Sequence, residues 1–118
     1  MMNIETLRSY CLSLQGVTES FPFDEVTLVF KVGNKMFALT NLDGPLSVNI
    51  KCDPDEAITL REQYMAVTPG YHMNKVHWNT VMVDGSIPDK TIKLWILNSY
   101  NLIFSSLPKK VQQSITNP

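Results

Sequence analysis

One segment, residues 69–80, concentrates most of the side chains that could do chemistry. It reads Pro-Gly-Tyr-His-Met-Asn-Lys-Val-His-Trp-Asn-Thr and holds both histidines, one of two tryptophans and a lysine. Histidine and lysine can contact anions, histidine can exchange protons, and aromatic rings can stack on flat ligands. Such a segment is either a binding surface or a hydrogen-bonded structural corner, and its side-chain chemistry leaves both interpretations open.

Metal binding is the first chemistry to weigh for the two histidines. His72 and His77 are five residues apart, a spacing that fits neither a helical zinc pair nor the three-ligand sets of catalytic zinc sites. Asp43 or Asp84 would have to complete such a site through the fold. We therefore expect no metal site and no bound cofactor.

Nucleophilic catalysis finds little support. Cys52 precedes an expected helix start, where the helix dipole favours a thiolate, but Asp53, Asp55 and Glu56 oppose that effect. Cys11 falls on the apolar face of an expected helix and is predicted to lie in the core. The sequence also has no serine in a nucleophile elbow and no glycine-rich phosphate loop. We expect that the protein is not an enzyme.

Nucleic-acid contact is a further possibility. Lys75 lies beside Tyr71 and His72 in the sequence, and a lysine among aromatic rings can contact phosphate while the rings stack on bases. A solvated lysine in a turn is the simpler interpretation. In a strand, His77 and Asn79 would share one face, and Trp78 would lie on the other, where packing is its ordinary role.

Charge is unevenly distributed along the chain. The formal net charge is −1, with nine acids and five bases in residues 1–62 but two acids and five bases in residues 63–118. The two halves thus carry net charges of −4 and +3, and an anionic partner should meet the second half. Lys109 and Lys110 add positive charge near the end of that half.

The first half of the chain contains one expected helix and three expected strands. Apolar residues recur at helical spacing over residues 4–15. Residues 27–32 and 35–40 read as strands of a hairpin joined by Gly33-Asn34. Residues 46–51 alternate between apolar and polar side chains, which predicts a third strand with one buried face.

The second half adds two helices and two strands. Asp53, Pro54 and Glu56 form a helix start that combines an N-cap, a first-turn proline and a capping-box glutamate. The later expected elements are two extended segments at 65–71 and 77–83, a long helix from Pro88 to Leu107, and a short helix or loose tail at 109–115.

These elements predict one α+β domain over residues 1–118, with a mostly antiparallel sheet of about five strands covered on one face by helices. Hydrophobic residues make up 44% of the chain and charged residues 18%, as expected for a globular protein. The sequence shows neither a secretory signal nor a membrane span, and the two distant cysteines fit a reducing compartment. We expect a soluble, cytoplasmic protein.

An ordered set of motifs resembles the MmcQ/YjbR family over about residues 3–110. The motifs are Ser20-Phe21-Pro22-Phe23-Asp24, Val29-Phe30-Lys31-Val32, Lys35-Met36-Phe37-Ala38, Lys51-Cys52-Asp53-Pro54, Pro69-Gly70-Tyr71-His72-Met73-Asn74-Lys75, His77-Trp78-Asn79 and Ser99-Tyr100. The resemblance implies a bacterial protein with a compact fold like that of the frataxin homologue CyaY, in a family described as DNA-binding. It does not carry over an iron site, because the available acids already have a capping explanation.

Two hypotheses follow. The leading one is weak, salt-sensitive DNA binding without catalysis, through the surface around residues 71–79 and nearby lysines. Its candidate contact residues are Tyr71, His72, Lys75, His77, Trp78, Asn79, Lys109 and Lys110. The alternative is a module that binds a protein or a small molecule in an aromatic and histidine pocket. That pocket would be lined by Phe21, Phe23, Tyr71, His72, His77 and Trp78.

Overall fold

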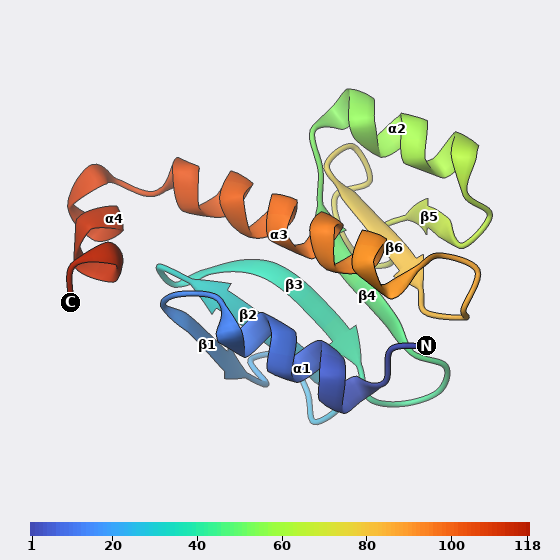
Figure 1. The fold of residues 1–118 in the computed structure, drawn as a ribbon, viewed down its shortest axis with the longest axis horizontal. Coiled ribbons are helices and arrows are strands. Elements are labelled where there is room, and N and C mark those ends of the chain that lie inside the picture. The colour runs from blue at the N-terminus through green and yellow to red at the C-terminus, as the bar shows by residue number, and fades with distance from the viewer.

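The structure is a computed structural model that describes residues 1–118, and it combines four helices with one six-stranded sheet (Figure 1). The α+β class and the single antiparallel sheet predicted from the sequence are confirmed. The helices are α1 (Ile4–Ser13), α2 (Pro54–Gln63), α3 (Asp89–Ser106) and α4 (Lys109–Thr116). The strands are β1 (Val17–Ser20), β2 (Thr27–Val32), β3 (Lys35–Asn41), β4 (Ser47–Lys51), β5 (Val67–Pro69) and β6 (Trp78–Met82).

The strands lie in the order β1-β2-β3-β4-β6-β5, and every neighbouring pair is antiparallel. The predicted hairpin is β2 and β3, and its two turn residues, Gly33 and Asn34, both have positive φ, at 56° and 67°. Two successive positive φ values are typical of the type I′ turn, whose twist matches that of the flanking strands.

The sixth strand is β1, which the sequence did not predict. It has four residues, Val-Thr-Glu-Ser, and it pairs only with β2 at the edge of the sheet. Because this short run has a single apolar residue, it shows no alternating pattern from which a strand could be predicted. The strand forms because β2 offers a free edge for pairing. The segment at 109–115, predicted as a helix or a loose tail, is helical in α4.

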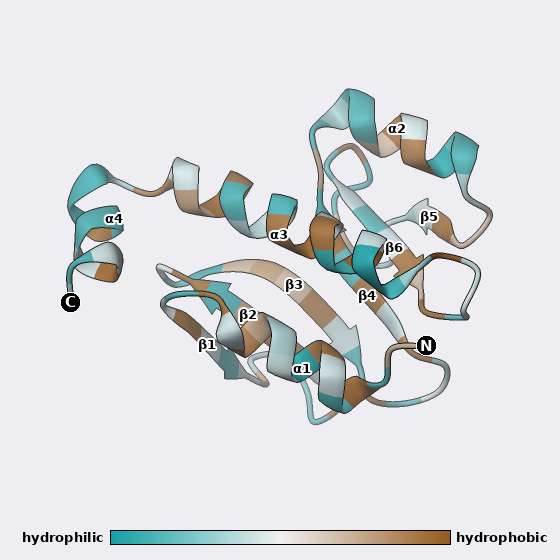
Figure 2. Ribbon diagram, viewed as in Figure 1, coloured by the Kyte–Doolittle hydropathy of each residue, from teal (hydrophilic) through white to brown (hydrophobic).

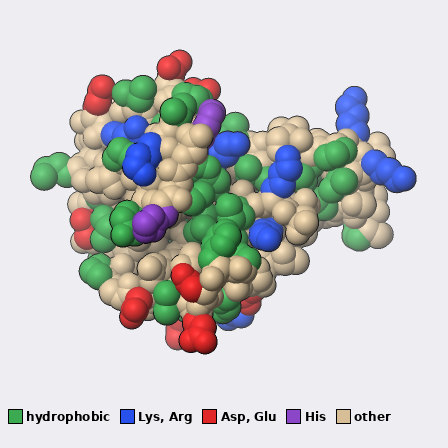
Figure 3. Space-filling model, turned by 180° about the vertical axis from the view of Figure 1, so that it is seen from behind, with side chains coloured by type: hydrophobic (Ala, Val, Ile, Leu, Met, Phe, Trp, Pro, Cys, Tyr) green, Lys and Arg blue, Asp and Glu red, His purple; other side chains and the backbone are tan.

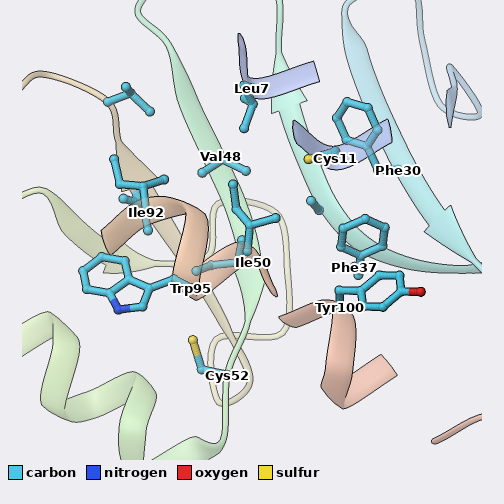
Figure 4. Close-up of a cluster of buried hydrophobic side chains, with 14 of the residues drawn as sticks. Leu7, Cys11, Phe30, Phe37, Val48, Ile50, Cys52, Ile92, Trp95 and Tyr100 are labelled. Carbon is cyan, nitrogen blue, oxygen red and sulfur yellow. The ribbon is translucent and has the colours of Figure 1, made fainter. Parts of the chain in front are cut away.

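The main core lies between one face of the sheet and helices α1 and α3 (Figure 1). Leu28, Phe30 and Val32 point into it from β2, since alternate residues of a strand share a face. Figure 4 shows Phe37 beside the ring of Tyr100 from α3, and their centroids are 5.3 Å apart in an edge-on arrangement. Hydrophobic residues recur along the strands and along α3, while much of α2 and α4 is hydrophilic (Figure 2).

A β-bulge interrupts the β2–β3 ladder at Phe37, which lies between two residues that pair normally with β2. The bulge places both Phe37 and Ala38 in the core. The Ser99 hydroxyl from α3 donates to the carbonyl of Phe37 (2.6 Å) and accepts from the backbone N–H of Lys51 (2.8 Å). Ser99 thereby links β3 to β4 beyond their last paired residues. None of the four helices has the length and apolar character that a membrane-spanning segment requires.

Candidate functional site

The second face of the sheet carries no helix and is called here the open face. Val29, Leu39 and Trp78 form a small buried cluster on it, and Met36 and Met73 pack against that cluster. Trp78 is only 8% exposed, so its side chain packs against neighbours instead of standing free. The strand alternation expected for this segment is therefore confirmed, with Trp78 and Asn79 on opposite faces.

A hollow of about 860 Å³ lies on the open face. Its strand residues are Thr27, Met36, Leu39, Thr40, Asn41, Ser47, Asn49, Thr80 and Met82. Its loop residues are Phe23, Asp24, Asp43, Pro45, Tyr71, His72, Met73 and Asn74. Of the six residues expected to line a pocket, Phe23, Tyr71 and His72 do so; Trp78 lies in the cluster beneath, and Phe21 and His77 are absent from the lining.

The loop between β5 and β6 reaches this hollow because its two ends are held close together. The N–H of Gly70 donates to the carbonyl of Trp78 at 2.8 Å. A Cβ on Gly70 would lie 2.8 Å from the Cβ of Trp78 and 3.0 Å from its carbonyl oxygen, so only glycine allows this approach. The N–H of Tyr71 then donates to Thr80 Oγ1 at 3.0 Å, which fixes where the loop leaves the sheet.

Two aromatic side chains stand at the rim of the hollow. Tyr71 is 70% exposed, and its ring centroid lies 4.0 Å from that of the exposed His72. His72 has a φ of 59°, in the left-handed region that non-glycine residues seldom adopt. The side chains of both residues take part in no intramolecular hydrogen bond. They are the two predicted contact residues that the structure leaves accessible at the hollow.

Lys75 has a structural role in the same loop. Its ammonium group donates to the carbonyl of Gly70 at 3.2 Å, and its own carbonyl accepts from the guanidinium of Arg61 in α2. His77 is half-buried, and its carbonyl accepts from the N–H of Cys52 at 2.7 Å. These contacts tie both ends of the loop to neighbouring elements.

Asn79 does not reach the surface. It is 0% exposed, its Oδ1 accepts from Arg61 Nε at 2.6 Å, and its Nδ2 donates to the carbonyl of Ala57 at 3.2 Å. The expectation that Asn79 offers hydrogen bonds to a partner is therefore corrected. Its amide holds α2 against β6, and its complete burial keeps it out of reach of a ligand.

The predicted lysines do not converge on one surface. Lys109 and Lys110 lie on α4, at the end of the molecule opposite α2 and the β5–β6 loop (Figure 1). The ammonium of Lys93 lies 5.7 Å from the centroid of the Tyr10 ring, in the helix layer. Charge in the second half of the chain is thus dispersed, and Lys109 and Lys110 do not join the 71–79 surface.

Electrostatically, the hollow itself is mildly acidic. Asp24 and Asp43 line it, and no lysine or arginine does. Hydrogen bonds from the backbone of Thr27 and Val26 and from the Thr27 hydroxyl lower the pKa of Asp24, so it carries a negative charge at neutral pH. In Figure 3, hydrophobic side chains gather at the centre of this face near the histidines, and acidic groups lie mainly toward the edges.

Two lysines flank the hollow without lining it. Lys31 pairs with Met36, and Lys51 pairs with Trp78, on strand positions that point to the open face. Both lysines belong to residues 1–62, the half of the chain with a net charge of −4. Spatial position, not net charge along the sequence, therefore decides where a cationic surface could form.

Other reactive groups are buried or dispersed. Burial raises the pKa of the Cys11 thiol to about 12. Burial, followed by the negative charge of Glu56, raises that of Cys52 to about 11. Both cysteines are unpaired. No three histidine, cysteine, aspartate or glutamate side chains lie close enough together to hold a metal ion.

Comparison with known proteins places this arrangement in a family. The model of the YjbR family matches residues 12–102, which include the whole hollow and the 69–80 segment but not α4. The chain belongs to the YjbR family. The resemblance inferred from the sequence motifs is confirmed.

Relatives of the YjbR family match the chain along most of its length. The uncharacterized protein YbdF of Escherichia coli O157:H7 is 35% identical over 112 residues, covering 94% of this chain and 92% of YbdF. YjbR of Escherichia coli K12 is 34% identical over 110 residues, covering 92% and 93%.

Solved structures of similar proteins share the fold. A Deinococcus radiodurans protein with a DUF419 domain superposes with a TM-score of 0.93 at 38% identity, covering 100% of this chain and 91% of that one. A Pseudomonas syringae protein gives a TM-score of 0.76 at 26% identity, with 86% and 99% covered. This YjbR chain therefore shares its overall fold with both solved structures.

Sequence reasoning missed the residues that form most of the hollow. Met36, Asn41, Asn49 and Met82 come from three different strands and form no local motif. A partial signal existed, since alternation in β4 placed Asn49 opposite the buried Val48 and Ile50. Which strands lie side by side, and hence which open-face residues meet, depends on the sheet order.

Proposed function

We propose that this YjbR-family protein is a non-catalytic binding protein whose ligand site is the hollow on the open face. The observation that carries the proposal is the hollow itself, about 860 Å³ in volume and bounded by both apolar and polar side chains. Ligand sites typically have volumes of about 300–1,000 Å³, with apolar walls and a few polar groups that orient the ligand. Tyr71 and His72 stand at its rim, with their rings in contact with each other and free of intramolecular hydrogen bonds.

The framework of the hollow supports binding, because its floor is rigid while its rim is accessible. The floor belongs to paired strands, with Asn49 opposite Thr80 and Ser47 opposite Met82. The loop that carries Tyr71 and His72 is held by hydrogen bonds at Gly70 and Lys75. A site built on paired strands holds its polar groups in place before the ligand arrives, which lowers the entropy lost on binding.

Binding without catalysis is part of the proposal. A nucleophile needs an adjacent base or a lowered pKa, whereas both thiols are buried and have raised pKa values. Neither cysteine lines the hollow. The imidazole of His72 is paired with the Tyr71 ring and has no carboxylate bonded to it, so it lacks the orienting partner of a catalytic base.

Nucleic-acid binding is the second candidate, and Lys31 and Lys51 favour it. Both lysines lie on the open face beside the hollow, where they can neutralise phosphates while Tyr71 offers a ring for base stacking. The acidic lining and the −1 net charge count against strong binding. The salt dependence of duplex binding by charge-matched lysine variants tests this candidate.

Mapping of NMR chemical shifts tests the leading proposal. A chemically diverse fragment collection, with anionic, cationic and uncharged members, is added to ¹⁵N-labelled protein. Binding in the hollow should shift the amide signals of Met36, Leu39, Asn49 and Met82 together. Hits that shift only helix-layer signals, or the absence of hits from every charge class, would refute the proposal.

A pair of tryptophan variants gives the matched control. Ser47→Trp places a large ring in the hollow without touching the main core, because Ser47 points to the open face. Thr18→Trp places the same ring on the same sheet face, two strands from Met36 and outside the hollow. Fragment binding should be lost in Ser47→Trp and kept in Thr18→Trp.

A further inference from the structure

Three asparagines line the hollow, and each has its side-chain oxygen engaged within the chain. Asn41 Oδ1 accepts from the N–H of Asp43 at 2.8 Å, and Asn74 Oδ1 accepts from the N–H of Val76 at 2.9 Å. A backbone N–H can only donate, so the atom that faces it must be the carbonyl oxygen of the side chain. The NH₂ groups of these two asparagines therefore have no hydrogen-bond partner within the chain.

In Asn49, the third asparagine, the side-chain oxygen is engaged by the hydroxyl of Thr80. Thr80 Oγ1 accepts from the N–H of Tyr71 at 3.0 Å, and its own proton is donated to Asn49 Oδ1 at 2.6 Å. This direction of donation leaves the Nδ2 of Asn49 without an acceptor inside the chain. In all three asparagines the side-chain oxygen thus accepts a hydrogen bond within the chain, whereas the NH₂ group is free to donate to a ligand.

The charges that line the hollow, unlike Lys31 and Lys51 beside it, disfavour an anionic ligand. Asp24 and Asp43 line it, and no basic side chain does. A carboxylate or phosphate placed there would be repelled by two like charges, with no lysine or arginine in the lining to offset them. An uncharged acceptor satisfies the asparagine donors without that repulsion.

Apolar surface supplies the remaining contact. Met36, Met73 and Met82 line the hollow together with Leu39. Methionine side chains are unbranched and polarizable, so they adjust to ligands of varied outline. The ligand should accordingly bury an apolar part against these residues.

We propose that the hollow takes an uncharged, partly apolar small molecule that presents hydrogen-bond acceptors, of which an amide or ester carbonyl is the simplest. This inference rests on the proposed function, and it names the ligand chemistry of the same site. Asn41, Asn49 and Asn74 donate to the ligand oxygens, and the methionines pack against its apolar part.

A matched ligand series tests the chemistry. Three compounds share a phenylbutyl scaffold and end in an N-methylamide, a carboxylate or an ammonium group, and their affinities are measured by NMR titration. The amide should bind at least about tenfold more tightly than the carboxylate, a difference equivalent to roughly one charge-assisted interaction. Equal or tighter binding of the carboxylate would overturn the inference.

Asn49→Asp replaces the free NH₂ group of the side chain with a carboxylate oxygen and adds one negative charge. The aspartate keeps an oxygen that accepts from Thr80, but it has no N–H to donate to a ligand. Affinity for the amide should fall by about threefold to tenfold. Asn101→Asp, on the exposed surface of α3, makes the same change outside the hollow and should leave the affinity unchanged.

The outcomes of these experiments distinguish the existence of the binding site from the chemistry of its ligand. If Ser47→Trp abolishes binding but Asn49→Asp does not weaken the amide, the site stands and the ligand chemistry is wrong. If none of the three compounds binds, the inference is overturned. If, in addition, no member of the wider fragment collection shifts hollow signals, the proposed function fails with it.

Discussion

Arg61 joins three parts of the molecule through one guanidinium group. Its Nε donates to Asn79 Oδ1 at 2.6 Å, and a second nitrogen reaches the carbonyls of Lys75 and Trp78. Helix α2, strand β6 and the loop that borders the hollow are thereby held in one arrangement. At this scale, the polar residues of the 69–80 segment divide into groups that hold the loop and groups that face solvent.

We expect Asn79→Ala to lower the free energy of unfolding by about 1–3 kcal/mol, because Ala57 and Arg61 lose a buried partner. Urea unfolding followed by circular dichroism measures the change. Asn101→Ala, at an exposed position of α3, should stay within about 0.5 kcal/mol of the parent protein. Equal stability of the two variants would mean that the Asn79 network contributes nothing.

The two thiols should react slowly in the folded protein. Their pKa values are raised to about 12 for Cys11 and about 11 for Cys52, so the reactive thiolate is scarce at pH ~8. Iodoacetamide should modify neither residue appreciably within the time needed for complete reaction in urea, as read by mass spectrometry. Rapid labelling of native Cys52 would show that its environment favours the thiolate.

The raised pKa values of Cys11 and Cys52 also predict how the stability of the protein changes at alkaline pH. Burial raises the pKa of both thiols above the ordinary value of 9.0, to about 12 for Cys11 and about 11 for Cys52 in the folded chain. Above pH ~9 the unfolded chain therefore loses protons that the folded chain retains, and stability falls as the pH rises. A double Cys→Ala variant should lose less stability than the parent between pH ~9 and ~11, measured by urea unfolding at each pH.

At the scale of elements, Ser99 compensates for the β-bulge in β3. The bulge leaves Phe37 without a paired residue on β2, and the Ser99 hydroxyl bonds both Phe37 and Lys51. One side chain of α3 thus satisfies a buried carbonyl and extends the connection between β3 and β4. The arrangement also fixes α3 against the sheet.

Ser99→Ala should destabilise the protein by about 1–3 kcal/mol, since the carbonyl of Phe37 loses its buried donor. The more specific readout is hydrogen exchange, in which the amide of Lys51 should lose protection by at least about tenfold. Ser105→Ala, exposed on the same helix, is the control. Unchanged protection at Lys51 would show that another group replaces the hydroxyl.

Much of the element order was predictable because it depends on local patterns. Turn chemistry at Gly33-Asn34 and the capping residues around Asp53 fixed β2, β3 and the start of α2. Strand β1 has too few residues to show alternation, and it depends on the neighbouring edge of β2. The burial of Asn79 was likewise hidden, since strand alternation gives its face but not the helix that covers it.

The candidate site was predicted only in part, because most of its residues come together through contacts between strands. The sequence pointed to Tyr71 and His72 through their density in one segment, and both lie at the hollow. Asn41, Asn49 and Met36 became neighbours through the pairing of β3 with β2 and β4. Contacts between strands are long-range, and one sequence does not reveal them.

At the scale of the whole molecule, the basic residues form no single surface. Lys31 and Lys51 lie on the open face beside the hollow, whereas Lys109 and Lys110 lie on α4 at the far end. A net charge of −1 gives no overall attraction to a polyanion. Any binding to DNA should therefore depend on which local pair of lysines is present.

Charge-matched double variants test the DNA candidate. Lys31→Ala/Lys51→Ala should weaken binding to a duplex at low salt and reduce the slope of log affinity against log salt by about two, since each phosphate contact contributes about 0.9. Lys109→Ala/Lys110→Ala removes the same charge from α4 and should leave the slope unchanged. Fluorescence anisotropy measures both. Absence of duplex binding by the parent protein, or equal effects of the two variants, would rule out an open-face DNA site.

A crystal structure of the protein soaked with the phenylbutyl N-methylamide tests the central claim most directly, because it locates the ligand. The account predicts density in the hollow between the Tyr71–His72 rim and the methionines, with the ligand carbonyl within hydrogen-bonding distance of Asn49 Nδ2. Ligand density confined to the helix layer, or an empty hollow at saturating concentration, would contradict it.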